Sequence, residues 1–238
     1  MRLLTAIPVY NEEAHLAPVL AEVLRYVDDV LVVDDGSSDG TPERLAEFPG
    51  VKVVRHPVNQ GYGAGLRSAF KYTLEHGYDG LVTLDCDGQH EPRRIPDIAA
   101  PLANFDVVSG SRYLQVFDPG QRPPEARRKI NVEVTRWLNE CLNLNLTDAF
   151  CGFKAYRASA LAKFDITDLG YAMPLQAWVQ MVEHGMSVVE VPVELIYLDE
   201  NRAFGGALDD AEFRLNHYRS VFQEAMQRAG LEVGGGCR

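Results

Sequence analysis

The chain has 238 residues, of which 46% are hydrophobic and 24% are charged, and its formal net charge is -11. This length and composition predict one large folded domain with an ample core and exclude a disordered chain. The acidic excess excludes nucleic-acid binding through an overall basic field, so a polyanionic partner must be met by a local basic surface. No uninterrupted apolar run approaches the roughly 18 residues of a membrane span.

The N-terminal region and the cysteines predict a cytoplasmic protein. Apolar residues starting at Leu3 give way to polar ones by Asn11, which is too soon for a secretory signal. The four cysteines show no CxxC or other metal-ligand spacing, and reduced thiols are the simplest interpretation. They are Cys86, Cys141, Cys151 and Cys237. The protein would therefore reach a membrane-bound substrate by peripheral contact with the cytoplasmic face of the membrane.

Strands and helices alternate through the first half of the sequence. Short apolar runs predict strands, and apolar residues at helical spacing predict the helices between them. The expected strands are residues 3–9, 30–33, 51–55 and 81–84, and the expected helices are residues 12–26, a segment from 41 onward, and 61–75. Thr41 is expected to cap the second helix. The pattern predicts an α/β fold, a mostly parallel central sheet with helices on both faces.

Polar loops follow three of these strands. Residues 8–12, 34–39 and 85–90 lie at carboxyl ends of strands, which is where ligands of doubly wound sheets bind. We therefore expect the three loops to converge on one crevice.

Two carboxylates, Asp85 and Asp87, stand one residue apart after the fourth strand. Extended backbone would place both side chains on the same side. Two such charges repel unless a cation or a shared proton lies between them, and oxygen ligands favour a hard ion such as Mg²⁺ or Mn²⁺. The alternative is that an aspartate caps the turn after the strand.

The second half is less regular and carries a local basic surface. We expect helices at residues 95–103, 127–142, 174–184 and 209–228, an amphipathic strand-like segment after Gly152, a strand at 188–195, and a loose tail at 231–238. Cations surround one acid, Glu125; they are Arg122, Arg127, Arg128 and Lys129. These residues form either a solvated helix start or a phosphate-binding surface. Because cations at a helix N-terminus oppose its dipole, they look less like pure stabilisation of the helix.

Ordered motifs along the chain resemble those of family 2 glycosyltransferases. They are Ile7 to Glu12, Val33 to Thr41, Asn59 with Gly61 to Ala64, Asp85 to His90, and Ser109 to Tyr113. Later motifs most resemble dolichyl-phosphate mannose synthase and related polyprenyl-phosphate sugar transferases. They are Thr147-Asp148 with Gly152 to Tyr156, and Arg202 with Phe204 to Gly206. The resemblance covers about residues 3 to 206.

The resemblance implies a GT-A (Rossmann-like) fold that binds an activated nucleotide-sugar. Residues 1–230 would form one domain, with a nucleotide-sugar-binding half at 1–113 and an acceptor half at 114–230. The nucleoside-binding positions correspond to Pro8, Tyr10, Glu12 and Asp35. A carboxylate there accepts hydrogen bonds from a base or from ribose hydroxyls, although Asp35 could instead only form a turn.

The same resemblance implies the metal and phosphate contacts. A Mg²⁺ or Mn²⁺ site that also contacts the nucleotide-sugar corresponds to Asp85, Asp87 and Gln89. Arg112 and Arg202 would add positive charge around the donor phosphates, because guanidinium groups suit phosphate geometry.

Two classes of acceptor are compatible with the sequence: a lipid phosphate and a hydroxyl group. A hydroxyl group needs a general base, and Asp148 matches the position where family members often carry one. A phosphate monoester, with a second pKa of about 6, is already anionic and needs no strong base. The basic surface that includes Arg128, together with Arg202, favours a polyprenyl or dolichyl phosphate. The predicted reaction is an inverting hexose transfer, first of all of mannose from GDP-mannose; a UDP-hexose and a soluble or glycan hydroxyl acceptor are the alternatives.

Two other classes of protein explain fewer of the residues. A receiver-like signalling module would account for Asp34 and Asp35 but would not need the loops at residues 85–90 and around Arg202. A non-catalytic nucleotide-sugar-binding subunit would not need the complete set of catalytic residues. The sequence makes no prediction of oligomeric state.

Overall fold

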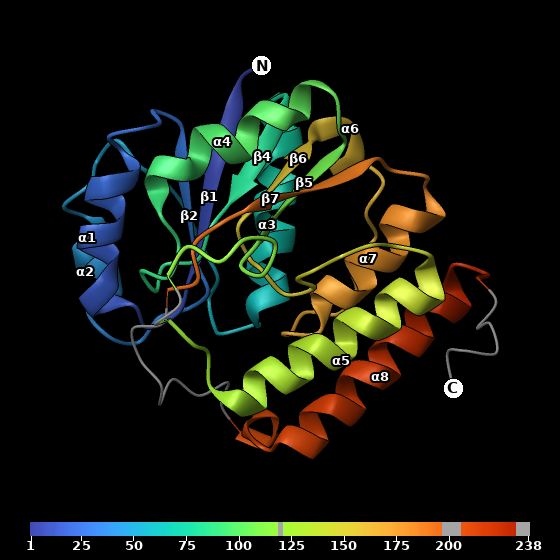
Figure 1. Ribbon diagram of the computed structural model, residues 1–238. Coiled ribbons are helices and arrows are strands. Elements are labelled where there is room, and N and C mark those ends of the chain that lie inside the picture. The colour runs from blue at the N-terminus through green and yellow to red at the C-terminus, as the bar shows by residue number, and fades with distance from the viewer. Residues whose placement is uncertain (119–120, 197–205, 232–238) are drawn as a thin grey trace.

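The computed structural model describes residues 1–118, 121–196 and 206–231. Within these ranges, the centre is a seven-stranded sheet with the order β3-β2-β1-β4-β6-β5-β7 (Figure 1). Its strands are β1 (Leu3–Val9), β2 (Val30–Asp34), β3 (Lys52–Arg55), β4 (Gly80–Thr83), β5 (Val107–Ser111), β6 (Lys154–Arg157) and β7 (Val188–Pro192). Among these strands, only β6 pairs antiparallel, with β4 and with β5. The predicted mostly parallel sheet is confirmed.

Helices cover both faces of the sheet, as predicted. One face packs on α1 (Glu13–Val23), α2 (Thr41–Leu45) and α4 (Ile95–Ala99); the other packs on α3 (Tyr62–Glu75), α5 (Glu125–Leu142), α6 (Ala158–Leu161), α7 (Met173–Glu183) and α8 (Ala211–Arg228). β2 illustrates the cause, since all of its residues are buried and successive side chains alternate between faces. Val30 and Val32 enter the first core, and Leu31 and Val33 enter the second.

The C-terminal helices form a layer of their own over the second face. α5 and α8 run side by side at the bottom of Figure 1, and α7 packs against both. α8 turns Tyr218, Phe222, Ala225 and Met226 into the core. Because this layer lies at the carboxyl edge of the sheet, its side chains can face the loops that follow the strands.

Several element ends differ from the predictions. The helix expected at residues 95–103 divides after η1 (Pro92–Arg94) into α4 and a 3-10 turn, η2 (Ala100–Ala103). Pro101 accounts for the division because it has no N–H to continue the α-helical bonding. Thr41 does not cap α2; its hydroxyl oxygen accepts a hydrogen bond from the backbone N–H of Glu12 at 2.9 Å. η3 (Gly206–Asp209) precedes α8.

Three smaller features bear on the sequence-based expectations. No helix in the described ranges combines the length and apolarity needed to cross a bilayer. Cys86 and Cys151 are free and buried, but Cys141 is disulfide-bonded, so the expectation of reduced thiols is wrong there. Leu231 packs against the core, and the rest of the expected tail, residues 232–238, lies outside the described residues.

Candidate active site

A cavity of about 420 Å³ opens at the carboxyl edge of the sheet. The loops after β1, β2, β4 and β5 contribute to its wall, as expected for a doubly wound sheet. The wall brings together most of the residues predicted from the sequence: Pro8, Tyr10, Glu12, Asp35, Asp85, Asp87, Gln89 and Arg112. Asp148 and Arg128 are described but lie outside this wall, and Arg202 is outside the described residues.

Asp35 lines the cavity and also shapes the turn beside it. Its buried carboxylate accepts hydrogen bonds from the backbone N–H groups of Gln60 at 2.9 Å and Gly61 at 2.7 Å. Nδ1 of buried His56 lies 2.6 Å from the same carboxylate. Asp35 therefore fixes the loop after β3 rather than its own turn, and the nucleoside contact stays a prediction. His56 was not predicted, although its position directly after β3, at the same edge of the sheet, was an available signal.

The loop after β1 is fixed by the loop after β2. Asn11 has a left-handed φ of 55°, which asparagine tolerates better than most residues. Its side-chain oxygen accepts a hydrogen bond from the N–H of Ser38 at 2.8 Å. Glu12 is only 6% exposed, and its carboxylate lies 2.8 Å from Nδ1 of His15. With the contact to Thr41, these interactions hold Glu12 in the cavity wall.

Asp85 and Asp87 both line the cavity, but they do so from a loop. β4 ends at Thr83, and Gly88 takes a φ of 73° in the turn that follows. Oδ1 of Asp87 accepts a hydrogen bond from the N–H of Gln89 at 3.0 Å, so the turn-capping alternative is present as well. The expected extended backbone is wrong here, whereas the expected convergence of the two residues on one site is confirmed.

Three neighbours fix the position of Asp85. The hydroxyl group of Tyr62 donates a hydrogen bond to Oδ1 at 3.1 Å. The backbone N–H of Asp85 donates to Nδ1 of buried His90 at 3.0 Å. The third neighbour is Gly152, whose missing side chain leaves room for the carboxylate, because a Cβ there would collide with Asp85 Oδ2. The carboxylate is thus oriented by protein groups and by shape.

The atoms offered here suit a hard divalent cation. Asp85 and Asp87 carry carboxylates, Gln89 carries an amide oxygen, and such oxygen ligands favour Mg²⁺ or Mn²⁺. The side chain of Asp85 is 32% exposed, which leaves it accessible from the cavity. In the described part of the chain, no group of three or more His, Cys, Asp or Glu residues could hold a metal unaided. Substrate oxygens and water would have to complete the coordination.

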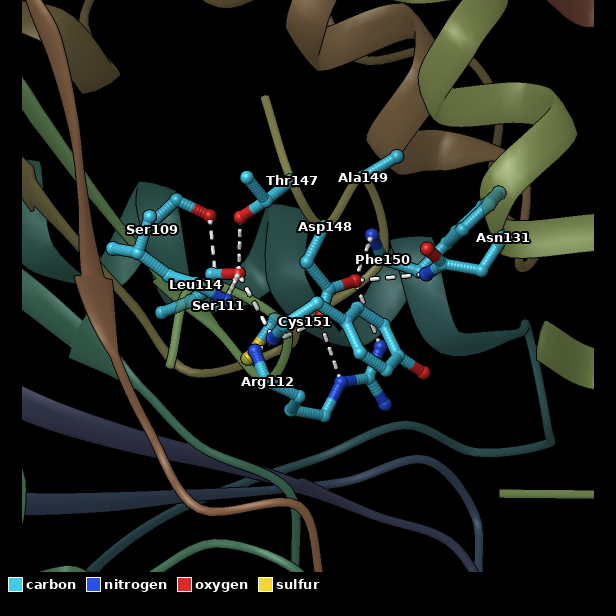
Figure 2. A network of polar contacts seen from close by, with 12 residues as sticks. Ser109, Ser111, Arg112, Leu114, Asn131, Thr147, Asp148, Ala149, Phe150 and Cys151 are labelled. Atoms are coloured by element: carbon cyan, nitrogen blue, oxygen red, sulfur yellow. Dashed lines mark hydrogen bonds and ion pairs between the residues drawn. The ribbon is translucent and has the colours of Figure 1, made fainter. Parts of the chain in front are cut away.

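Arg112 and Asp148 form an ion pair with two hydrogen bonds (Figure 2). Nε lies 2.6 Å from Oδ2, and Nη2 lies 2.9 Å from Oδ1. Asp148 is 0% exposed and also accepts hydrogen bonds from the Asn131 side chain at 2.8 Å and the Phe150 N–H at 3.1 Å. Burial alone would raise the pKa of Asp148, but Arg112, the Asn131 side chain and the charge of Lys154 lower it to about 2. The general-base role stays a prediction that this geometry does not favour, because the carboxylate orients Arg112 instead.

The basic surface at the start of α5 divides into two parts. Arg127 lines the cavity. Arg128 lies with its guanidinium carbon 3.6 Å from the centre of the Tyr113 ring, and its Nη1 donates to Asn131 Oδ1 at 3.4 Å. Successive helical residues point about 100° apart, so the two arginines cannot share one direction. The structure places Arg127 in the cavity wall, whereas the predicted Arg128 lies outside it, and the acceptor role stays a prediction.

Residues that the sequence analysis did not single out complete the wall. The rings of Tyr62 and Tyr171 stack with centres 5.7 Å apart, and both residues line the cavity. Arg214 and Tyr218 of α8 line it as well. Their spacing of four residues places them on one face of the helix, which was the available signal. By sequence alone this face is indistinguishable from any amphipathic helix face.

Comparisons with known proteins agree with this geometry. The model of the family described as "Glycosyl transferase family 2" matches residues 5–164. The chain is 36% identical over 225 residues to undecaprenyl-phosphate mannosyltransferase of Micrococcus luteus, covering 89% of this chain and 91% of that protein. It is 30% identical over 230 residues to polyprenol monophosphomannose synthase of Mycolicibacterium smegmatis, covering 90% and 85%.

A solved structure shares the fold. Glucosyl-3-phosphoglycerate synthase from Mycobacterium tuberculosis, in complex with uridine diphosphate, matches with a TM-score of 0.72 and 20% identity, covering 98% of this chain and 82% of that chain. The seven-stranded sheet and its helices have the GT-A fold of glycosyltransferases. More narrowly, the chain belongs to glycosyl transferase family 2, whose model covers well over half of its length. The resemblance seen in the motifs is thereby confirmed.

Proposed function

We propose that this glycosyltransferase moves a hexose from a nucleotide-sugar to a polyprenyl phosphate, with mannose from GDP-mannose as the first candidate. The names of the Micrococcus and Mycolicibacterium relatives support a mannosyl transfer to such a lipid. A UDP-hexose is the second candidate donor, since a relative from Methanococcus voltae, 27% identical, is named as a transferase from UDP-N-acetylglucosamine to dolichyl phosphate. The observation that carries the proposal is that three arginines of an acidic protein line the cavity: Arg112, Arg127 and Arg214.

The residues of the cavity wall support different binding roles for the two halves of the chain. Residues 1–113 contribute the acidic loops and Arg112, which we assign to the nucleotide-sugar. Residues 114–230 contribute Arg127, Arg214 and aromatic side chains, which we assign to the acceptor. The two halves share one sheet, because β6 and β7 pair with strands of the first half.

In the proposed mechanism, the protein binds the donor and orients its diphosphate. Pro8, Tyr10, Glu12 and Asp35 would contact the nucleoside. Asp85, Asp87 and Gln89 would hold Mg²⁺ or Mn²⁺, which supplies positive charge beside the diphosphate. Arg112, fixed by Asp148, adds a second positive charge that needs no reorganisation as the sugar bond breaks.

The acceptor phosphate then attacks the anomeric carbon of the sugar. A bond forms between a phosphate oxygen and that carbon while the carbon–oxygen bond to the donor diphosphate breaks. The electron pair of the broken bond leaves with the nucleoside diphosphate. Attack opposite the leaving group inverts the anomeric configuration.

The position of Asp148 supports a phosphate acceptor over a hydroxyl acceptor. The attacking oxygen of a phosphate monoester is already anionic, since its second pKa is about 6. A hydroxyl group would need a base on the cavity wall. Asp148 is completely buried and engaged with Arg112, so it is poorly placed for that task.

Lipid delivery requires a surface that meets the membrane, and we assign it to the segment beside Tyr113. Leu114, Val116 and Phe117 are 45%, 73% and 36% exposed. This apolar segment is followed in sequence by the basic surface at residues 122–129, so it matches an anionic bilayer in both polarity and charge. We propose peripheral contact at the cytoplasmic face.

The proposal is tested by transfer of labelled sugar to polyprenyl phosphate. GDP-mannose, UDP-glucose and UDP-N-acetylglucosamine would each be offered with Mn²⁺ or Mg²⁺, alongside an EDTA control. We expect a metal-dependent lipid product from one donor. Donor hydrolysis or binding without a lipid product, together with transfer to a soluble hydroxyl acceptor, would contradict the lipid phosphate.

A further inference from the structure

The turn that carries Asp148 is held by a carboxylate from a distant strand. Glu190 of β7 accepts hydrogen bonds from the N–H and the hydroxyl group of Thr147, both at 2.8 Å, and from the N–H of Asp148 at 3.1 Å. Glu190 is half-buried and is not part of the cavity wall. Three donors converge on one carboxylate, and its two oxygens can accept all three hydrogen bonds.

The same turn is connected to the end of β5. Oγ of Ser111 lies 2.5 Å from Oγ1 of Thr147, and the N–H of Arg112 donates to Asp148 Oδ2 at 3.2 Å (Figure 2). β7 is the strand that pairs with β5, with Glu190 opposite Ser109. The strand that supplies Glu190 therefore also supports the strand from which Arg112 emerges.

Charges around this connection are balanced inside the protein. Buried Lys154 of β6 donates to the hydroxyl oxygen of Ser109 at 2.5 Å, on the residue paired with Glu190. Arg112 and Lys154 offset the charges of Asp148 and Glu190. Buried charges need partners and hydrogen bonds, and removing one charge leaves its partners uncompensated.

We propose that Glu190 is a positioning residue for Arg112. It holds the Thr147-Asp148 turn, Asp148 holds the guanidinium, and the guanidinium meets the donor diphosphate. The last step rests on the role given to Arg112 in the proposed function. The first two steps rest on hydrogen bonds alone.

The proposal is tested by a double-mutant cycle in nucleotide binding. Affinities for GDP and for UDP, each with Mn²⁺, would be measured by calorimetry for Glu190→Ala, Arg112→Ala and the double variant. Glu190→Ala should weaken binding about tenfold, a size typical of residues that orient a ligand contact. In the Arg112→Ala background its effect should fall below about twofold, because both changes remove the same contact. Equal losses in both backgrounds would overturn the proposal.

Two further variants separate positioning from folding. Glu190→Gln keeps one acceptor oxygen for three donors, so its binding should lie between wild type and Glu190→Ala. Glu194→Ala, a partly exposed carboxylate just beyond β7, is the matched control and should bind nucleotide as wild type does. Wild-type binding by Glu190→Ala would also overturn the proposal.

A direct readout separates this proposal from the proposed function. The Arg112 Nε–H signal in NMR spectra should be protected from exchange in wild type and Glu194→Ala, and lost in Glu190→Ala. Its retention in Glu190→Ala would refute the positioning role. If Arg112→Ala alone leaves nucleotide affinity unchanged, the phosphate role of Arg112 fails, and the loss of the Nε–H signal still decides whether Glu190 positions the guanidinium.

Discussion

The hydroxyl group of Tyr62 donates a hydrogen bond to Asp85 Oδ1 at 3.1 Å, while the Tyr62 ring stacks on Tyr171. One side chain at the start of α3 thus joins a candidate metal ligand to the half of the chain that we assign to the acceptor. The stacking fixes the ring, and the fixed ring aims the hydroxyl group. Groups that hydrogen-bond to a metal ligand set its orientation and its affinity for the metal.

Tyr62→Phe should therefore weaken Mn²⁺ binding about tenfold, because it removes the hydrogen bond and keeps the ring. Mn²⁺ affinity in the presence of nucleotide can be followed by electron paramagnetic resonance. Tyr72→Phe on the same helix is the control, since that ring stacks on His76. Unchanged Mn²⁺ affinity in Tyr62→Phe would contradict the orienting role.

Asp87→Ala should abolish turnover while leaving the fold stable. A cation beside the diphosphate is worth several kcal/mol, so the rate should fall by at least about 100-fold. Turnover and thermal unfolding would be measured together, with the exposed Asp97→Ala of α4 as control. Full activity in Asp87→Ala would remove this residue from the metal site.

Arg127→Ala and Arg128→Ala should behave differently although the residues are adjacent. A lost charge-assisted hydrogen bond costs about 1.5 to 3 kcal/mol, so Arg127→Ala should raise the KM for polyprenyl phosphate about 10- to 100-fold. Arg128 is not part of the cavity wall and packs on the ring of Tyr113, which is, so its removal should raise that KM much less. A larger effect at Arg128 would restore the assignment made from the sequence.

Asp148 should add a measurable pH dependence to stability. Its pKa is about 2 in the folded protein and 3.8 without the fold, so its contribution is present above about pH 4 and is lost as the pH falls through about 2. Chemical denaturation gives the free energy of unfolding of wild type and of Asp148→Asn. The difference between the two proteins should be about 2 kcal/mol smaller at pH 2 than at pH 5. The exposed Asp97→Asn should show no such trend. A pH-independent difference for Asp148→Asn would exclude the ion pair as its source.

Val116→Asp should weaken binding to vesicles that contain phosphatidylglycerol and polyprenyl phosphate. A charge on the most exposed apolar side chain of the segment 114–117 opposes its insertion. Val58→Asp, on a residue 63% exposed elsewhere, is the matched control. Cosedimentation measures the difference, and equal binding by both variants would argue against the segment as the membrane contact.

The amino-acid sequence was enough to predict the sheet and most of the cavity residues from the N-terminal half. Short apolar strands alternate with helices, and this pattern predicts parallel strands whose carboxyl ends share one edge. Loops after β1, β2 and β4 must then meet, so Glu12, Asp35 and Asp85 could be placed together without coordinates. Local patterns suffice there because each residue lies within a few positions of a strand end.

The burial of Asp148 and the part of the cavity wall that comes from the C-terminal half follow from the tertiary structure. Asp148 carries the same sequence signal whether it faces the cavity or is buried against Arg112, 36 residues away. β6 enters antiparallel between β4 and β5, and α8 brings Arg214 to the cavity from the end of the chain. These placements depend on how distant elements pack. Burial and hydrogen-bond partners decide whether a carboxylate can act as a base or instead orients another side chain. Neighbouring residues in the sequence do not reveal either property.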